Sequence, residues 1–229
     1  MPRDSATSYF PARVSGGAGW FADAAANRQC RREYRAVSRY LFAFGAPVLS
    51  NYYQGQPSYR LLWRGRYSRP LLLTLRRTPD GGVLQTQFLN KHPQQFGVTT
   101  LPPGPNPDHP HLTPDERKRL LQEQQLLATN DEYLATAARA RAPVVVVNAE
   151  LVALNTAQVR QFTTLLDQAG FWQLPACVAD TGAAEGGWTL EAATAGGYYV
   201  VSRHRPGSGL RRCGEYLRSL SPARMDELL

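Results

Sequence analysis

The sequence predicts an α+β fold with a mainly antiparallel sheet, built from two hairpin or meander segments that pack with three to four helices. Two observations carry this prediction. Strand-like segments follow one another in two runs, at residues 59–89 and 188–204, and strands joined by short turns pair in antiparallel fashion. Segments with helical periodicity lie before, between and after these runs, which is the order expected of an α+β protein.

The first predicted element is a helix over residues 28–44. Its apolar residues recur at the spacing of one helix face: Tyr34, Val37, Leu41 and Phe44. Arginines occupy its other faces: Arg31, Arg32, Arg35 and Arg39. Gly45 and Pro47 end the helix. The preceding residues 1–27 contain a glycine-rich run and are predicted to form a flexible arm.

Three strands are predicted next, as a meander with one face covered. Residues 59–64 alternate between apolar side chains, which we expect in the core, and arginines, which we expect at the surface. Residues 69–77 and 83–89 supply the other two strands. The Pro-Asp-Gly-Gly turn at residues 79–82 joins them, with turn chemistry that suits a hairpin.

A loop rich in Pro and Gly over residues 93–112 separates the meander from the next helix. Thr113 and Glu116 have the spacing of a capping box, which predicts a helix that starts there and extends toward Ala140. The valine run at 144–147 then predicts a buried strand.

The predicted C-terminal part contains a helix, a hairpin and a final helix. The first helix is capped by Asn155 or Thr156 and is stopped by Gly170. The hairpin consists of strands at 188–194 and 198–204. The final helix has an apolar stripe formed by Leu210, Cys213, Leu217 and Leu220.

The cysteines and the hydropathy predict a cytoplasmic protein without membrane insertion. Cys30, Cys177 and Cys213 lie far apart, their number is odd and no CxxC pair occurs, so we expect buried free thiols in a reducing compartment. No secretory signal is visible. The apolar run at 41–49 is too short to span a bilayer.

The net charge of +8 is unevenly distributed along the chain. Residues 1–100 hold 14 basic and 4 acidic side chains, whereas residues 101–229 hold 12 and 14. Such asymmetry is typical of proteins that bind nucleic acid or an acidic partner. A GC-rich genome is the other interpretation, because nearly all the basic residues are arginine.

Several short patterns occur together in the C-terminal half: Phe171-Trp172-x-Leu174-Pro175, Gly187-Trp188-x-Leu190-Glu191, Gly197-x-Tyr199-Val200-Val201-x-Arg203-x-x-Pro206 and Tyr216-Leu217. The N-terminal half adds Pro47-Val48-Leu49 and Tyr59-Arg60-x-x-Trp63-x-Arg66. These patterns resemble a family of uncharacterised bacterial proteins, and the resemblance covers about residues 32–221. The resemblance implies no activity, cofactor or site residue. It implies that residues 101–142 are an insertion in a single domain at 28–229.

No recognisable metal, cofactor or catalytic motif occurs, so we predict none of these sites. Residues 108–111 and Asp115 include residue types that bind metal ions. Prolines flank both histidines, however, and we do not expect this loop to form a preorganised metal-coordination shell. Asp180, Glu185 and Glu191 cluster in sequence around Trp188, as carboxylates do in a sugar site. For Glu191 we expect instead a cross-strand ion pair with Arg203.

The function predicted from the sequence is that of a non-enzymatic interaction protein, of immunity or accessory type, which docks an acidic protein. The expected Arg- and Tyr-rich face consists of Arg60, Arg64, Arg66, Arg69, Tyr52, Tyr53 and Tyr67. The alternative is nucleic-acid binding by the same face, because arginines neutralise phosphates and aromatic rings stack on bases. A second alternative is a hydrolase of unrecognised type whose polar centre is formed by Glu185, Glu191 and Arg203.

Overall fold

The computed structural model describes most of the chain in eight stretches: residues 8–11, 24–51, 53, 55–65, 68–93, 111–128, 142–178 and 186–222. The chain forms two compact units. One combines Met1–Pro93 with Val144–Leu229, and the other is Gln94–Pro143. In the described part of the chain no helix has both the length and the apolar character needed to cross a membrane.

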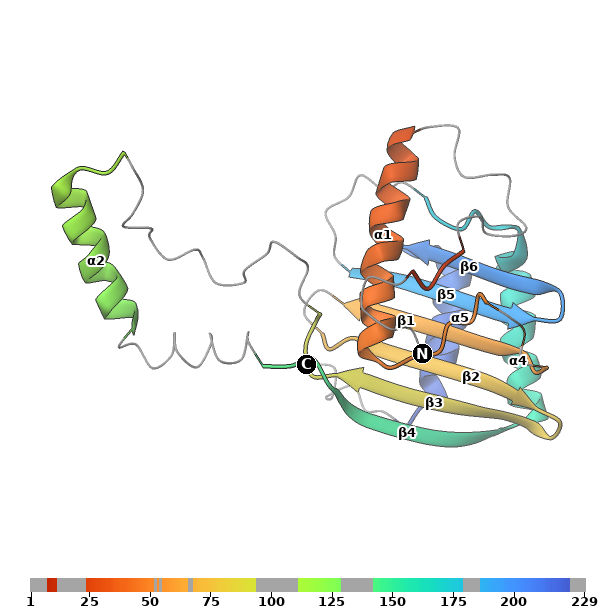
Figure 1. Cartoon of the computed structure of the whole chain (residues 1–229). Helices are drawn as coiled ribbons and strands as arrows, with labels where there is room; N and C mark the ends of the chain where they lie inside the picture. Colours follow the sequence, from red (N-terminus) through yellow and green to blue (C-terminus); the bar gives the residue numbers. More distant parts are fainter. Residues whose placement is uncertain are drawn as a thin grey trace. The chain divides into compact units, whose positions relative to one another are not determined.

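The larger unit is built on an antiparallel sheet, which confirms the predicted fold class (Figure 1). The strands are β1 (Ser58–Gly65), β2 (Leu71–Thr78), β3 (Gly81–Leu89), β4 (Val146–Asn155), β5 (Gly186–Thr194) and β6 (Gly197–Arg203). As described, the sheet has six strands in the order β4-β3-β2-β1-β5-β6. The second hairpin therefore joins the first meander along β1, which pairs with β5.

Helices cover both faces of this sheet. Helix α1 (Ala24–Ala43) lies across one face, and α4 (Thr156–Gln168) and α5 (Ser208–Ser219) lie on the other (Figure 1). A short 3-10 helix, η1 (Phe171–Gln173), follows α4. The prediction that only one face of the meander is covered is therefore wrong, and the physical reason is the apolar stripe of α1, which needs a partner surface.

Each face of the sheet has its own hydrophobic core, because alternate side chains of a strand point to opposite faces. The core beneath α4 and α5 includes Leu61, Leu73, Phe162 and Leu217. The core beneath α1 includes Val37, Leu41, Leu62 and Leu72. Burying each such side chain contributes roughly 1.5–3 kcal/mol. Tyr9 and Phe10, which lie within the range predicted as a flexible arm, are buried in the α1 core.

Local sequence signals explain several boundaries. Asn155 ends β4 and caps α4 through a capping box with Gln158. Gly81 has a φ of 145° at the start of β3, and a Cβ there would clash with the carbonyl oxygen of Leu154 on the neighbouring strand. A glycine is therefore required where β3 begins beside β4.

Strand β4 differs from its prediction as a buried strand. It lies at the edge of the sheet, and Val145, Val147 and Leu151 are 43%, 42% and 70% exposed. The β-branched run correctly predicted a strand, but strand propensity does not distinguish an edge from a centre.

The smaller unit contains the described helix α2 (Pro114–Ala128). Its predicted capping box is confirmed: the Thr113 backbone N–H donates to Glu116 over 2.8 Å, and the Glu116 N–H donates to the Thr113 hydroxyl over 3.3 Å. The Thr113 hydroxyl also donates to the Glu116 carboxylate over 2.7 Å, and this bond, together with the one from the Thr113 backbone N–H, lowers the pKa of Glu116. The predicted extension to Ala140 lies outside the described residues.

Candidate functional site

A buried ion pair joins the two halves of the sheet. Arg60 on β1 lies directly opposite Glu191 on β5, and both side chains are 1% exposed. The Arg60 Nε donates to Glu191 Oε2, and its Nη1 donates to the Pro47 carbonyl over 2.6 Å. The Tyr198 hydroxyl donates to Glu191 Oε1 over 2.5 Å. Burial and the adjacent carboxylate raise the pKa of Tyr198, so this hydroxyl remains a donor.

The predicted pair between Glu191 and Arg203 is wrong because of strand register. Glu191 on β5 pairs with Val200 on β6, whereas Arg203 on β6 pairs with Trp188 on β5. Arg203 donates instead to the backbone carbonyls of Ser202 and Pro175, over 2.7 and 2.6 Å. The proposed polar centre is therefore not formed by Glu191 and Arg203, and Glu185 lies outside the described residues.

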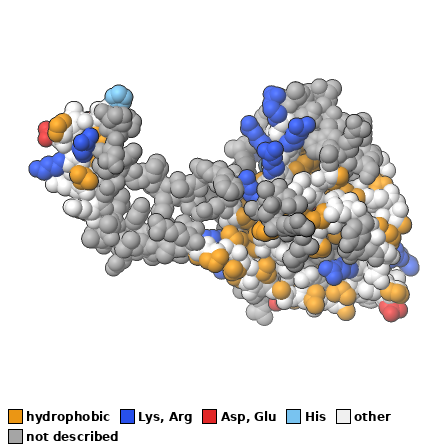
Figure 2. Space-filling model, viewed as in Figure 1, with side chains coloured by type: hydrophobic (Ala, Val, Ile, Leu, Met, Phe, Trp, Pro, Cys, Tyr) orange, Lys and Arg blue, Asp and Glu red, His pale blue; other side chains and the backbone are white. Residues whose placement is uncertain are grey.

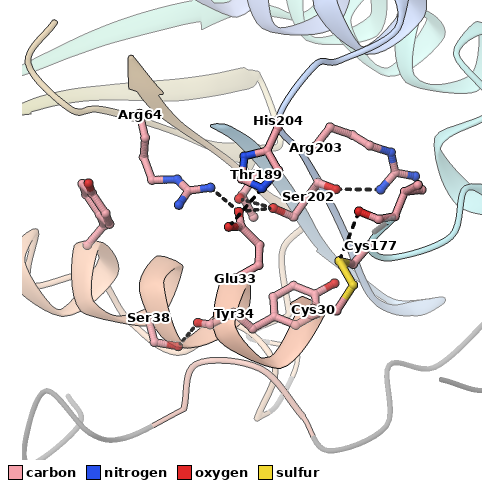
Figure 3. A network of polar contacts seen from close by, with 12 residues as sticks. Cys30, Glu33, Tyr34, Ser38, Arg64, Cys177, Thr189, Ser202, Arg203 and His204 are labelled. Carbon is pink, nitrogen blue, oxygen red and sulfur yellow. Dashed lines mark hydrogen bonds and ion pairs between the residues drawn. A yellow bond between two sulfur atoms is a disulfide. The ribbon is translucent and has the colours of Figure 1, made fainter. Parts of the chain in front are cut away.

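A second ion pair fastens α1 to the sheet. Glu33 on α1 accepts from Arg64 on β1 and from the Ser202 hydroxyl on β6, the latter over 2.9 Å (Figure 3). Its other oxygen lies 3.7 Å from His204 Nε2. A Cβ at Gly187 would clash with the Arg64 guanidinium, so that glycine provides the space for the charge.

A disulfide fixes α1 three residues before Glu33. Cys30 is bonded to Cys177, 147 positions away in sequence, with a Cα–Cα distance of 6.0 Å (Figure 3). The prediction of three free thiols is therefore wrong for this pair. Widely separated cysteines carry no sequence signal for pairing, because only the fold brings them together. Cys213 is free and buried, and burial raises the pKa of its thiol to about 11.

The C-terminal end of α1 is held by a polar chain. The Tyr40 hydroxyl lies 2.8 Å from His92 Nδ1, and His92 Nε2 lies 2.9 Å from the Ser68 carbonyl oxygen. Because the carbonyl only accepts, Nε2 carries the proton, and in the neutral ring Nδ1 accepts from Tyr40. Burial lowers the pKa of His92, which favours this neutral form.

These contacts change the interpretation of the predicted Arg- and Tyr-rich face. Arg60 and Arg64 are buried beneath α1 and neutralised by glutamates, so neither forms an exposed surface. Arg69 and Tyr53 are exposed. The other predicted members lie outside the described residues: Arg66, Tyr52 and Tyr67. These arginines are buried because the alternation of β1 directs them to the face of the sheet opposite Tyr59 and Leu61, and α1 covers that face.

The outer side of α1 carries exposed arginines in place of the predicted face. We define the arginine ridge as Arg28, Arg31, Arg32 and Arg35, all exposed, with half-buried Arg39 continuing the same helical spacing. Within the described part of the chain, none of the four exposed members forms an ion pair with an acidic side chain. Figure 2 shows Lys and Arg side chains gathered over the corresponding half of α1.

The sequence placed Arg31, Arg32, Arg35 and Arg39 on other helix faces but did not indicate them, or Arg28, as the site. The sequence of α1 contained a signal for this surface. Glu33 is the lone acidic residue of the helix, and it marks the side that faces the sheet. Among the described residues, no group of three or more His, Cys, Asp or Glu side chains is arranged to hold a metal ion. Comparison with protein-family models, curated proteins and solved structures finds no match to this chain.

Proposed function

We propose that this chain is a non-enzymatic interaction protein, of immunity or accessory type, that docks an acidic protein through the arginine ridge of α1. One observation carries the proposal: four exposed guanidiniums without acidic partners in the described chain stand on one side of one helix. From Arg28 to Arg39 the ridge is about 16 Å long, at a rise of 1.5 Å per residue.

The attachment of α1 supports this role. The disulfide at Cys30, the carboxylate of Glu33 and the Tyr40–His92 contact fix the helix to the sheet or its loops at three points along its length. A helix held in this way presents its outer side chains without a large ordering cost on binding. Guanidiniums also form bidentate contacts with carboxylates, which gives orientation as well as attraction.

An acidic protein is favoured over nucleic acid because, among the described residues 28–35, no exposed aromatic ring offers a stacking platform. Single-stranded nucleic acid is held by aromatic faces interleaved with basic residues. Tyr34 is the aromatic residue of the segment 28–35, and it is buried in the α1 core. Nucleic-acid binding through the ridge is retained as an outcome of the test.

The test compares two double variants of equal charge. Arg31→Glu with Arg35→Glu reverses two ridge charges, whereas Arg76→Glu with Arg77→Glu reverses two exposed charges at the end of β2. We expect the ridge variant to bind polyglutamate at least tenfold more weakly than the control variant, a difference of about 1.4 kcal/mol. Binding is measured by fluorescence anisotropy at several salt concentrations.

Two results would contradict the proposal. Equal losses in both variants would show that only net charge matters. A single-stranded oligonucleotide that binds more tightly than polyglutamate, with a steep dependence on salt, would assign the ridge to nucleic acid.

The cytoplasmic location stays a prediction, and the disulfide provides its test. Thiols in the cytosol are normally kept reduced, so a Cys30–Cys177 bond is expected in an oxidising compartment. Alkylation of the protein at the moment of cell lysis shows which state occurs. Two alkylated thiols at these positions support the cytoplasm, and an intact bond excludes it.

A further inference from the structure

A pocket of about 340 Å³ opens on the α5 face of the sheet, on the side opposite the arginine ridge. Its floor consists of three buried leucines of β1 and β2: Leu61, Leu71 and Leu73. The volume is at the lower end of the range for small-molecule sites. Of the described residues that line the pocket, His204 also lies 3.7 Å from Glu33 of α1, and none belongs to the arginine ridge.

Two tryptophans form an aromatic wall in the pocket. The ring centroids of Trp63 on β1 and Trp188 on β5 lie 5.8 Å apart, with an interplanar angle of 44°. Gly214 in α5 makes this arrangement possible, because a Cβ there would clash with the Trp188 ring. A glycine within a helix costs about 1 kcal/mol relative to alanine, and the close approach of the indole accounts for its presence.

The rim of the pocket is basic. Among the described residues that line it are Arg205, Arg211 and Arg218 and one acid, Glu215. The guanidinium carbon of Arg218 lies 5.3 Å from the Trp63 ring centroid, which holds that charge over the aromatic wall. In the part of the chain that the structure describes, the exposed Arg205 and Arg211 form no ion pair.

We propose that this pocket binds a small aromatic anion, a ring-bearing molecule with one carboxylate or phosphate group. The partly exposed Trp63–Trp188 wall contacts the ring, because offset and edge contacts between aromatic rings are favourable. Arg205 and Arg211 bind the anionic group, because guanidiniums match the planar geometry of carboxylate and phosphate oxygens. A neutral ring leaves both guanidiniums without a partner and binds more weakly.

The experiment uses four probes in two matched pairs. Indole-3-acetate and adenosine monophosphate carry a carboxylate and a phosphate, and indole and adenosine are their neutral counterparts. Trp63 and Trp188 are two of the chain's four tryptophans, so intrinsic fluorescence reports binding, and isothermal titration calorimetry gives the affinity. The comparison of the two acids identifies which anionic group is preferred.

Two variants identify the site. Arg205→Gln with Arg211→Gln is expected to weaken binding of the preferred anion about tenfold, with little effect on its neutral counterpart. Arg76→Gln with Arg77→Gln, which removes the same charge from the far end of β2, is expected to bind like the unmodified protein. Equal affinity for the anions and their neutral counterparts, equal losses in both variants, or no binding of any probe at millimolar concentration would overturn the proposal.

Discussion

At the scale of single residues, the face of the sheet beneath α1 is organised by two arginines whose charges are compensated in the interior. Arg60 is neutralised by Glu191 within the sheet, and Arg64 is neutralised by Glu33 from α1. Moving such charges out of water costs several kcal/mol each, so each partner depends strongly on the other. These residues are consequently structural, and the proposed docking uses the exposed arginine ridge instead.

The Arg60–Glu191 pair gives a direct prediction for stability. Arg60→Leu or Glu191→Leu alone leaves one buried charge without compensation and should lower the free energy of unfolding by about 3–5 kcal/mol. The double variant should lose markedly less than the sum of the two single losses. Urea denaturation of the four proteins measures this difference, and strictly additive losses would contradict the assignment of a buried pair.

His92 gives a prediction for pH. Its pKa in the folded protein lies below the ordinary 6.5 because of burial, so below pH 6.5 the unfolded chain binds more protons than the folded one. Its contribution to stability is complete above pH 6.5 and is lost as the pH falls toward the folded pKa, with a slope of at most about 1.4 kcal/mol per pH unit.

The measurement compares unfolding free energies at pH 7.5 and 5.5. His92→Gln should reduce the loss of stability over this range. An unchanged pH dependence in the His92 variant would show that its ring is accessible to protons in the folded state.

At the scale of the elements, the central feature is the fastening of α1. Its inner side contributes apolar residues to one core, and Cys30, Glu33 and Tyr40 attach it to strands and loops that are distant in sequence. Its outer side is left with arginines. One helix therefore combines a structural face with the proposed recognition face.

The disulfide gives the prediction at this scale. Replacing both Cys30 and Cys177 with serine should lower the free energy of unfolding by about 2–5 kcal/mol, because the bond closes a long loop. Backbone hydrogen exchange should become faster in α1 while that of α4 changes little. Dithiothreitol should reproduce the effect in the unmodified protein and have none in the variant. Equal exchange in α1 with and without the bond would contradict its fastening role.

The sequence allowed most elements to be predicted, because periodicity and capping are local properties. The stripe of α1, the meander and the capping box at Thr113 are all present in the structure. The predicted exposure of Arg60 and Arg64 was wrong, because their burial depends on which element covers which face of the sheet. The alternation at 59–64 correctly separated Arg60 from Leu61, but nothing local indicates that α1 crosses over Arg60 or that β1 pairs with β5.

At the scale of the whole molecule, the smaller unit is inserted in the chain between strands β3 and β4 of the larger unit. The Asn90 N–H donates to the Val145 carbonyl, and the Val145 N–H donates to Asn90 Oδ1, both over 3.0 Å. These contacts close the junction between β3 and β4 within the larger unit. The sheet, both cores and the arginine ridge all belong to the larger unit.

Replacing residues 94–143 with a short Gly-Ser linker should therefore preserve the larger unit. We expect its free energy of unfolding to change by less than about 1 kcal/mol, since loop closure depends only weakly on length. Circular dichroism and urea denaturation measure this change. A shortened protein without cooperative unfolding would show that the smaller unit is required for the fold.

The measurement that tests the docking proposal most directly is photo-crosslinking in the cells of origin. A photoreactive residue is placed at Arg35 on the arginine ridge or, as the control, at exposed Arg77 on β2. We predict one discrete acidic protein crosslinked at position 35 and absent at position 77, with the signal lost when Arg31 is replaced by glutamate. Crosslinks to nucleic acid, the same products at both positions, or no product at position 35 would contradict the proposal.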